Sequence, residues 1–255
     1  MAKKLKNYNV LVKALDNFSL VNLDINVFNK KGENVFKKIK DSMADGWPRY
    51  YLSFIEENSE PFTLKTYNST KNWDGVLEYS TDAKRWSEWN GTQQIDSSSD
   101  GRLYIRGKGN TKITGGTDTY RGWRFSSEKL IRFKCLGNIE NLLDHEMVKT
   151  GSHPIMAEGC YANMFNSCTA LTQAPELPAT TLASRCYDNM FSNTALTQAP
   201  ELPATTLASY CYDNMFAFCW RLTGQIHCAS STSNDQNRLS NSSISGSSAT
   251  IVFDL

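Results

Sequence analysis

Apolar residues in the second half of the chain recur at a four-residue step. Leu182, Cys186 and Met190 follow this step, and Tyr187 and Phe191 stand one position after the last two of them. On an α-helix these five side chains would lie in a single stripe. The pattern therefore predicts an amphipathic helix that ends at the polar residues after Phe191.

The sequence segment that carries this pattern occurs almost three times in the chain. Residues 171–184 and 196–209 carry the same string, LTQAPELPATTLAS, and a Cys-Tyr pair recurs at Cys160, Cys186 and Cys211, so successive copies are 26 and 25 residues apart. Such a period is typical of solenoids, whose units bury their apolar side only against their neighbours. The prolines keep the extended part of each copy short, because proline cannot donate to a strand ladder.

These repeats carry a resemblance to a known family. The phrase CYxxMFxxCTxLTxAPxLPATTLA, within about residues 139–223, resembles the BspA-like leucine-rich repeats of gut-bacterial surface proteins and of phage and prophage proteins from the same habitat. The phrase WDGVLEYSTDAKRWSEW, from Trp73 to Trp89, is similar to the β-rich module that often precedes such repeats. The resemblance implies a surface for adhesion or recognition and brings no catalytic residues with it.

Short runs of β-prone residues fill the chain between residues 49 and 136. The runs are residues 50–54, 62–66, 76–79, 102–106 and 123–125, and turn residues such as Asn90-Gly91 and Asp100-Gly101 separate them. Several short strands at this spacing are typical of an antiparallel sandwich. We therefore expect an Ig-like β-sandwich module here.

The first 48 residues are basic and have a pattern of their own. Apolar residues alternate with polar ones from Val21 to Val27, as in a half-buried strand, and residues 35–43 place apolar side chains on one helical face. Two interpretations stand: a docking segment whose lysines meet an acidic partner, or a solvated lysine face on a small α/β piece. The docking candidates are Lys3, Lys4, Lys6, Lys30 and Lys31.

Together these patterns predict an α+β chain of four parts. They are a basic N-terminal α/β docking segment (1–48), the Ig-like antiparallel β-sandwich (49–136), a short leucine-rich-repeat solenoid with its N-terminal cap (137–228), and a Ser/Asn-rich tail that ends in a β-strand (229–255). An unpaired apolar edge invites association, so we expect the last strand to pair with the repeats or with another subunit.

Aromatic residues of the β-rich module are the candidates for ligand binding. Sugar rings pack on flat aromatic faces beside polar donors, and the candidates are Trp73, Trp86, Trp89 and Tyr120. The alternative is that these aromatics fill the core of the sandwich. Trp86 and Trp89 cannot both point to one face of a strictly alternating strand, so one of them is expected outside the core.

Composition and residue spacing argue against nucleic-acid binding, membrane insertion, metal binding and catalysis. A net charge of +1 over 255 residues gives no reason to expect attraction to nucleic acid or to an anionic membrane, and no apolar run approaches the length of a membrane span. The seven cysteines stand at no zinc spacing and mostly at repeat positions, which predicts buried thiols. The three histidines form no metal or triad pattern. We therefore expect no metal, no cofactor and no enzymatic activity.

The function expected is that of a non-enzymatic structural or recognition protein. The first interpretation is a phage virion surface component, a head or tail fibre or decoration protein, that meets other virion proteins through its N-terminal segment and displays an adhesion module to a host protein or glycan. The absence of an apolar signal core favours it over a secreted protein. The alternative is a bacterial cell-surface adhesin that binds host protein or glycan. Either interpretation is compatible with a homo-oligomer. The third hypothesis, held only for comparison with these two, is a glycan-active enzyme. Its catalytic acids would be Asp74, Glu78 and Glu88.

Overall fold

The computed structural model of the chain describes residues 50–114, 122–229, 239–240 and 242–253. The chain divides into two compact units, Met1–Arg49 and Tyr50–Leu255, and the described residues all belong to the second. The predicted N-terminal strand and helix, with the docking candidates Lys3, Lys4, Lys6, Lys30 and Lys31, lie outside the described residues.

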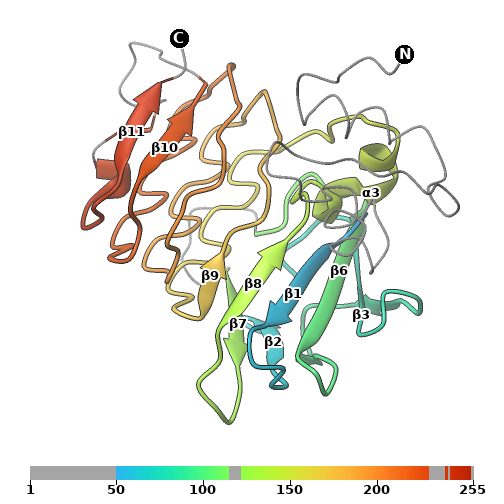
Figure 1. The fold of residues 1–255 in the computed structure, drawn as a ribbon. Coiled ribbons are helices and arrows are strands. Elements are labelled where there is room, and N and C mark those ends of the chain that lie inside the picture. Colours follow the sequence, from blue (N-terminus) through green and yellow to red (C-terminus); the bar gives the residue numbers. More distant parts are fainter. Residues whose placement is uncertain (1–49, 115–121, 230–238, 241, 254–255) are drawn as a thin grey trace, which may run out of the picture. The chain divides into compact units, whose positions relative to one another are not determined.

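Two sheets make up the β-rich part of this second unit (Figure 1). The larger has the strand order β4-β3-β6-β1-β8-β9 and the smaller the order β5-β2-β7. The strands are β1 Leu52–Glu56, β2 Thr63–Thr66, β3 Val76–Ser80, β4 Ser87–Trp89, β5 Ile95–Asp96, β6 Arg102–Lys108, β7 Trp123–Ser126, β8 Phe133–Leu136 and β9 Leu171–Gln173. The five predicted strands overlap β1, β2, β3, β6 and β7.

Alternation of apolar and polar residues decides which face of the larger sheet is buried. Leu52 and Phe54 of β1 stand opposite Ile105 and Leu103 of β6, and all four side chains are fully buried. Directly opposed residues of an antiparallel pair point to the same face. The Phe54 ring lies 6.0 Å from that of Trp123 on β7 in the smaller sheet. The two sheets therefore share a core, in which each large apolar side chain contributes about 1.5–3 kcal/mol.

The repeats contain no α-helix, so the helix predicted for Leu182, Cys186 and Met190 is wrong. The only α-helix in the described residues is α3, Asn141–Lys149, which has a kink at Asp144. Residues 158–167, 184–193 and 209–218 are instead runs of consecutive turns. Their apolar side chains are nevertheless buried, as Leu182, Cys186 and Met190 show at 4%, 0% and 0% exposure.

A left-handed residue at every fourth position accounts for these turns. In the second copy Arg185, Asn189 and Asn193 have φ angles of 55°, 54° and 56°. Asp188 and Ser192 donate their N–H groups to the carbonyls of residues 185 and 189, three positions back. A chain that turns every four residues buries every fourth side chain, and an α-helix produces nearly the same spacing. The apolar pattern alone therefore does not separate the two structures.

The predicted fold class is wrong for the same reason. The described residues consist of strands, turns and irregular chain with a single α-helix, which is not an α+β arrangement, and the repeats do not form a leucine-rich-repeat solenoid. Two packed sheets are present where an Ig-like sandwich was expected. The larger sheet does not end with the β-rich module, because β8 pairs in parallel with β9 of the first repeat.

Backbone hydrogen bonds place the three copies directly on one another. Tyr161 and Phe165 donate their N–H groups to the carbonyls of Cys186 and Met190 at 2.9 and 3.0 Å, and residues 187 and 191 donate in the same way to residues 211 and 215. Equivalent rings therefore stack, with the centroids of Phe165 and Phe191 5.7 Å apart. All seven cysteines are free and buried, which confirms that prediction.

The last part of the chain covers the third copy. The N–H of Phe216 donates to the carbonyl of Ser243 at 2.8 Å, in the 3-10 helix η3, Ser242–Ile244. Strand β10, Gln225–Cys228, pairs in parallel with β11, Thr250–Phe253. The final strand therefore pairs within the chain, which confirms the first of the two pairings that we expected for it.

Candidate functional site

Two of the predicted binding residues lie in the core. Trp73 and Trp89 are 4% and 0% exposed, and their ring centroids are 4.9 Å apart. Trp89 also lies 5.5 Å from Trp123 and donates its indole N–H to the carbonyl of Gln93 at 2.9 Å. Their burial leaves neither ring a face on which a ligand could pack. Tyr120 lies outside the described residues.

Trp86 is half-buried and packs against its own chain. Its ring centroid lies 5.6 Å from that of Tyr51, and the Arg106 guanidinium stands 4.2 Å over the ring. Arg106 in turn donates its Nε–H to Glu78 at 2.7 Å. Of the two tryptophans in the Trp86–Trp89 segment, Trp86 is therefore the one outside the core. Its environment is that of a cation–π pair with Arg106 of β6.

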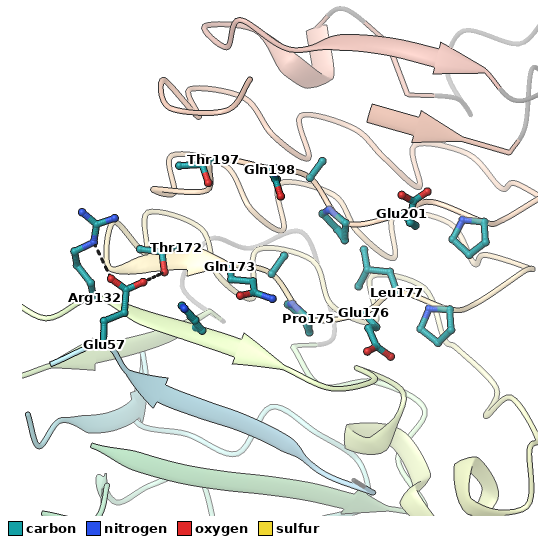
Figure 2. A pocket seen from close by; sticks show the side chains of 16 residues that line it. Glu57, Arg132, Thr172, Gln173, Pro175, Glu176, Leu177, Thr197, Gln198 and Glu201 are labelled. Carbon is teal, nitrogen blue, oxygen red and sulfur yellow. Dashed lines mark hydrogen bonds and ion pairs between the residues drawn. The ribbon is translucent and has the colours of Figure 1, made fainter. Parts of the chain in front are cut away.

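A hollow lies elsewhere, over the repeats. It has a volume of about 610 Å³, and its walls are two identical segments, residues 172–178 and 197–203, both with the sequence TQAPELP. We call these the proline segments and the hollow the repeat groove (Figure 2). Residues of the β-rich part complete its wall, namely Glu57, Arg132 and Lys134. Sequence patterns did not predict this groove.

The backbone ladder between the first two copies is interrupted where both copies line the groove. The first proline segment pairs on its outer side with the β8 region, where Glu176 donates to the Gly137 carbonyl at 2.9 Å. The second pairs with the third copy, where Leu202 donates to His227 at 3.1 Å. In the described residues no backbone hydrogen bond joins residues 172–178 to residues 197–203. The same two copies are bonded on both sides of this opening, by Ser167 to Ser192 and by Leu182 to Thr206.

Proline explains why the ladder opens at this point. Each proline segment carries two prolines, which have no N–H to donate and hold φ near −65°. The N–H groups of Ala199 and Glu201, which line the groove, have no hydrogen-bond partner among the described residues. The groove is thus bordered by extended chain whose main-chain polar groups are not all hydrogen-bonded to other described residues.

Charged side chains stand at both ends of the groove. At one end the Glu57 carboxylate accepts the Thr172 hydroxyl at 2.7 Å and lies 3.4 Å from Arg132 Nε. At the other end are Glu176 and Glu201, which stand at the same position of successive copies (Figure 2). Neither carboxylate forms an ion pair within the described part of the chain. Although Glu176 is exposed, partial desolvation in the groove raises the pKa of its carboxyl.

The thiols of the repeats are not placed for chemistry. Burial raises the pKa of Cys168 and of Cys211 to about 12 each, so both stay protonated at neutral pH. No cysteine lines the groove. Among the described residues no cluster of His, Cys, Asp and Glu side chains is suited to hold a metal ion.

Two of the three acids considered for glycoside hydrolysis, Asp74 and Glu78, have structural partners. Asp74 accepts the N–H and the hydroxyl of Thr111 at 2.9 and 2.6 Å, and these bonds lower the pKa of its carboxyl despite some desolvation. Glu78 is paired with Arg106. Both carboxylates therefore have a place in the fold as hydrogen-bond acceptors.

Two further findings concern the chain as a whole. Within the residues that the structure describes, no helix has the length and apolar character needed to cross a bilayer. Comparison of the chain with family models, with curated proteins and with solved structures gave no match.

Proposed function

We propose that this protein is a non-enzymatic recognition protein that holds its ligand in the repeat groove. The observation that carries the proposal is the opening between the two proline segments, a hollow of about 610 Å³ with unpaired polar groups along its walls. Ligand sites are typically concave and have a few polar groups that fix orientation. The stacked rings and thiols beneath it form a closely packed support, which suits a site that must keep its shape.

The setting that we propose is the surface of a phage virion. In this proposal the chain is a head or tail fibre or decoration protein whose N-terminal segment contacts other virion proteins and whose groove meets a host-surface protein or glycan. The sequence resemblance supports the setting, and the groove supports the binding role. A bacterial cell-surface adhesin would use the same groove and would differ in what the N-terminal segment contacts.

Blocking the groove tests the binding role. Thr197 is exposed and lines the groove, so Thr197→Arg places a long side chain in it, whereas Thr205→Arg adds the same charge at an exposed position outside it. We expect fluorescently labelled Thr197→Arg protein to lose binding to host cells and Thr205→Arg protein to keep it. Equal binding by the two variants would refute the role of the groove.

Antibody labelling of particles tests the setting. If the chain is a virion surface component, antibodies raised against residues 50–255 label intact purified phage particles from the source culture in electron micrographs. Label on the bacterial envelope, with none on particles, would favour the adhesin.

A further inference from the structure

The two proline segments are extended chains whose facing edges are not hydrogen-bonded to each other. Each segment is hydrogen-bonded on its outer side and not bonded to the other, although the same two copies are bonded before and after it. Main-chain donors such as Ala199 N–H and Glu201 N–H have no partner among the described residues. Unpaired edges of extended chain are the elements that bind an added peptide strand.

We propose that the ligand of the repeat groove is an extended peptide segment that carries a lysine or arginine side chain. Its main chain pairs with main-chain polar groups of the proline segments, and its cationic side chain lies at the end of the groove that holds Glu176 and Glu201. This inference rests on the proposed function, because it names the class of ligand for the same groove.

The two carboxylates explain the choice of a cation. Glu176 and Glu201 stand at the same position of successive copies, one on each proline segment, and both lie at this end of the groove (Figure 2). Neither has an ion-pair partner in the described part of the chain. Two carboxylates without cationic partners make this end of the groove negative, which favours a cationic ligand group. An ammonium or guanidinium group at this end can form a charge-assisted hydrogen bond with either carboxylate.

The lining of the groove favours a peptide over a glycan. None of the described residues that line it is aromatic, whereas sugar rings commonly pack on aromatic faces. The two exposed aromatic residues of the repeats, Phe218 and Trp220, belong to the third copy and do not line it. The groove is instead bordered by extended backbone with N–H groups that have no partner among the described residues. Such groups can pair with the repeating amide groups of a peptide.

Binding of defined peptides to the full chain tests the inference. The probe is a fluorescein-labelled decapeptide of alternating threonine and lysine, followed by fluorescence anisotropy at low salt, with alternating threonine and glutamate as the charge-reversed probe. A third probe carries N-methyl groups on alternate residues of the threonine–lysine peptide, which keeps its charge but removes its backbone donors. We expect the first probe to bind, and the other two to bind at least tenfold more weakly.

Matched variants distinguish peptide binding in the groove from attraction of the peptide to negative charge elsewhere on the protein. Glu176→Gln combined with Glu201→Gln should weaken binding of the threonine–lysine peptide about tenfold, because it removes both charges and keeps the shape. Glu158→Gln removes an exposed acid outside the groove and should leave the affinity unchanged. Equal binding of the N-methylated probe, or equal losses in the two kinds of variant, would overturn the inference.

The outcomes for the two proposals can be told apart. If Thr197→Arg abolishes binding to host cells but no peptide binds, the groove is a recognition site and its ligand is not a peptide; glycan-array signals that the same variant abolishes would then identify it as a glycan. If Thr197→Arg leaves binding to host cells intact, the proposed function itself fails. Peptide binding that weakens when Glu176 and Glu201 are both replaced by glutamine supports the proposed function and the peptide ligand together.

Discussion

The rings of Tyr161 and Tyr187 stack with centroids 5.8 Å apart and planes within 13° of each other, yet their hydroxyl groups differ. The Tyr161 hydroxyl donates to the Ile139 carbonyl at 3.3 Å, whereas the Tyr187 hydroxyl is buried without a partner. Stacking of identical copies thus fixes the position of the ring, while only the copy next to Ile139 supplies an acceptor.

This difference predicts opposite effects of removing the two hydroxyl groups. A buried polar group without a partner costs about 1–3 kcal/mol, and a net hydrogen bond contributes about 0.5–1.5 kcal/mol. We expect Tyr187→Phe to raise the free energy of unfolding by about 1 kcal/mol and Tyr161→Phe to lower it by about 0.5–1 kcal/mol. Urea unfolding of both variants measures this, and a loss of stability in Tyr187→Phe would show that its hydroxyl is satisfied.

A second prediction concerns the left-handed residues of the turns. Phe218 has a φ angle of 60° and is 52% exposed, and Asn193 holds the equivalent position of the preceding copy. Bulky residues are strained in this region, whereas asparagine and glycine tolerate it. We expect Phe218→Asn and Phe218→Gly each to raise stability by about 0.5–1 kcal/mol. A lower melting temperature in both variants would mean that contact of Phe218 with Trp220 outweighs the strain.

The buried carboxyl of Glu140 gives a prediction on pH. Glu140 is 1% exposed, and burial raises the pKa of its carboxyl despite the His153 Nδ1 atom 2.9 Å away. A carboxyl whose pKa is higher in the folded than in the unfolded state destabilises the fold when it is ionised, and this effect disappears as pH falls below the unfolded value. The stability of Glu140→Gln relative to the parent should therefore be higher at pH 7 than at pH 4.

Melting temperatures of the parent and of Glu140→Gln across that range measure the difference. Glu158→Gln, at an exposed position, is the control and should show a difference that does not vary with pH. A Glu140→Gln difference that is larger at pH 4 than at pH 7 would contradict the assignment.

The cysteines provide a test of the packing. All seven are free and buried, and burial raises the pKa of those in the repeats, so none should react in the native state. We expect an aromatic disulfide reagent to titrate no thiol in the native protein and all seven after unfolding in guanidinium. Rapid reaction of even one thiol before unfolding would place that cysteine outside the core.

Sequence patterns predicted strands of the β-rich part from short runs of β-prone residues. Residues 102–106 are one such run, and β6 forms there with Leu103 and Ile105 fully buried. The repeats were also correctly located, with Cys186 and Met190 buried. Their helix was predicted wrongly because a turn every four residues and a helix bury nearly the same positions.

The groove could not be predicted in the same way. It depends on which backbone groups of two copies fail to bond, and identical strings do not show that residues 172–178 and 197–203 separate while Ser167 and Ser192 stay bonded. The sequence does contain one indication, since prolines and polar residues stand in phase in both copies. Ligand binding was instead predicted at the tryptophans, and two of them, Trp73 and Trp89, are core residues.

The most direct test of the central claim is a nuclear magnetic resonance titration of the isotope-labelled chain with the threonine–lysine decapeptide. If the groove binds an extended chain through its open backbone, the amide signals of Ala199 and Glu201 shift with the peptide concentration, while those of Leu103 and Ile105 in the sheet core do not. Shifts confined to other parts of the molecule, or none at saturating peptide, would contradict the account.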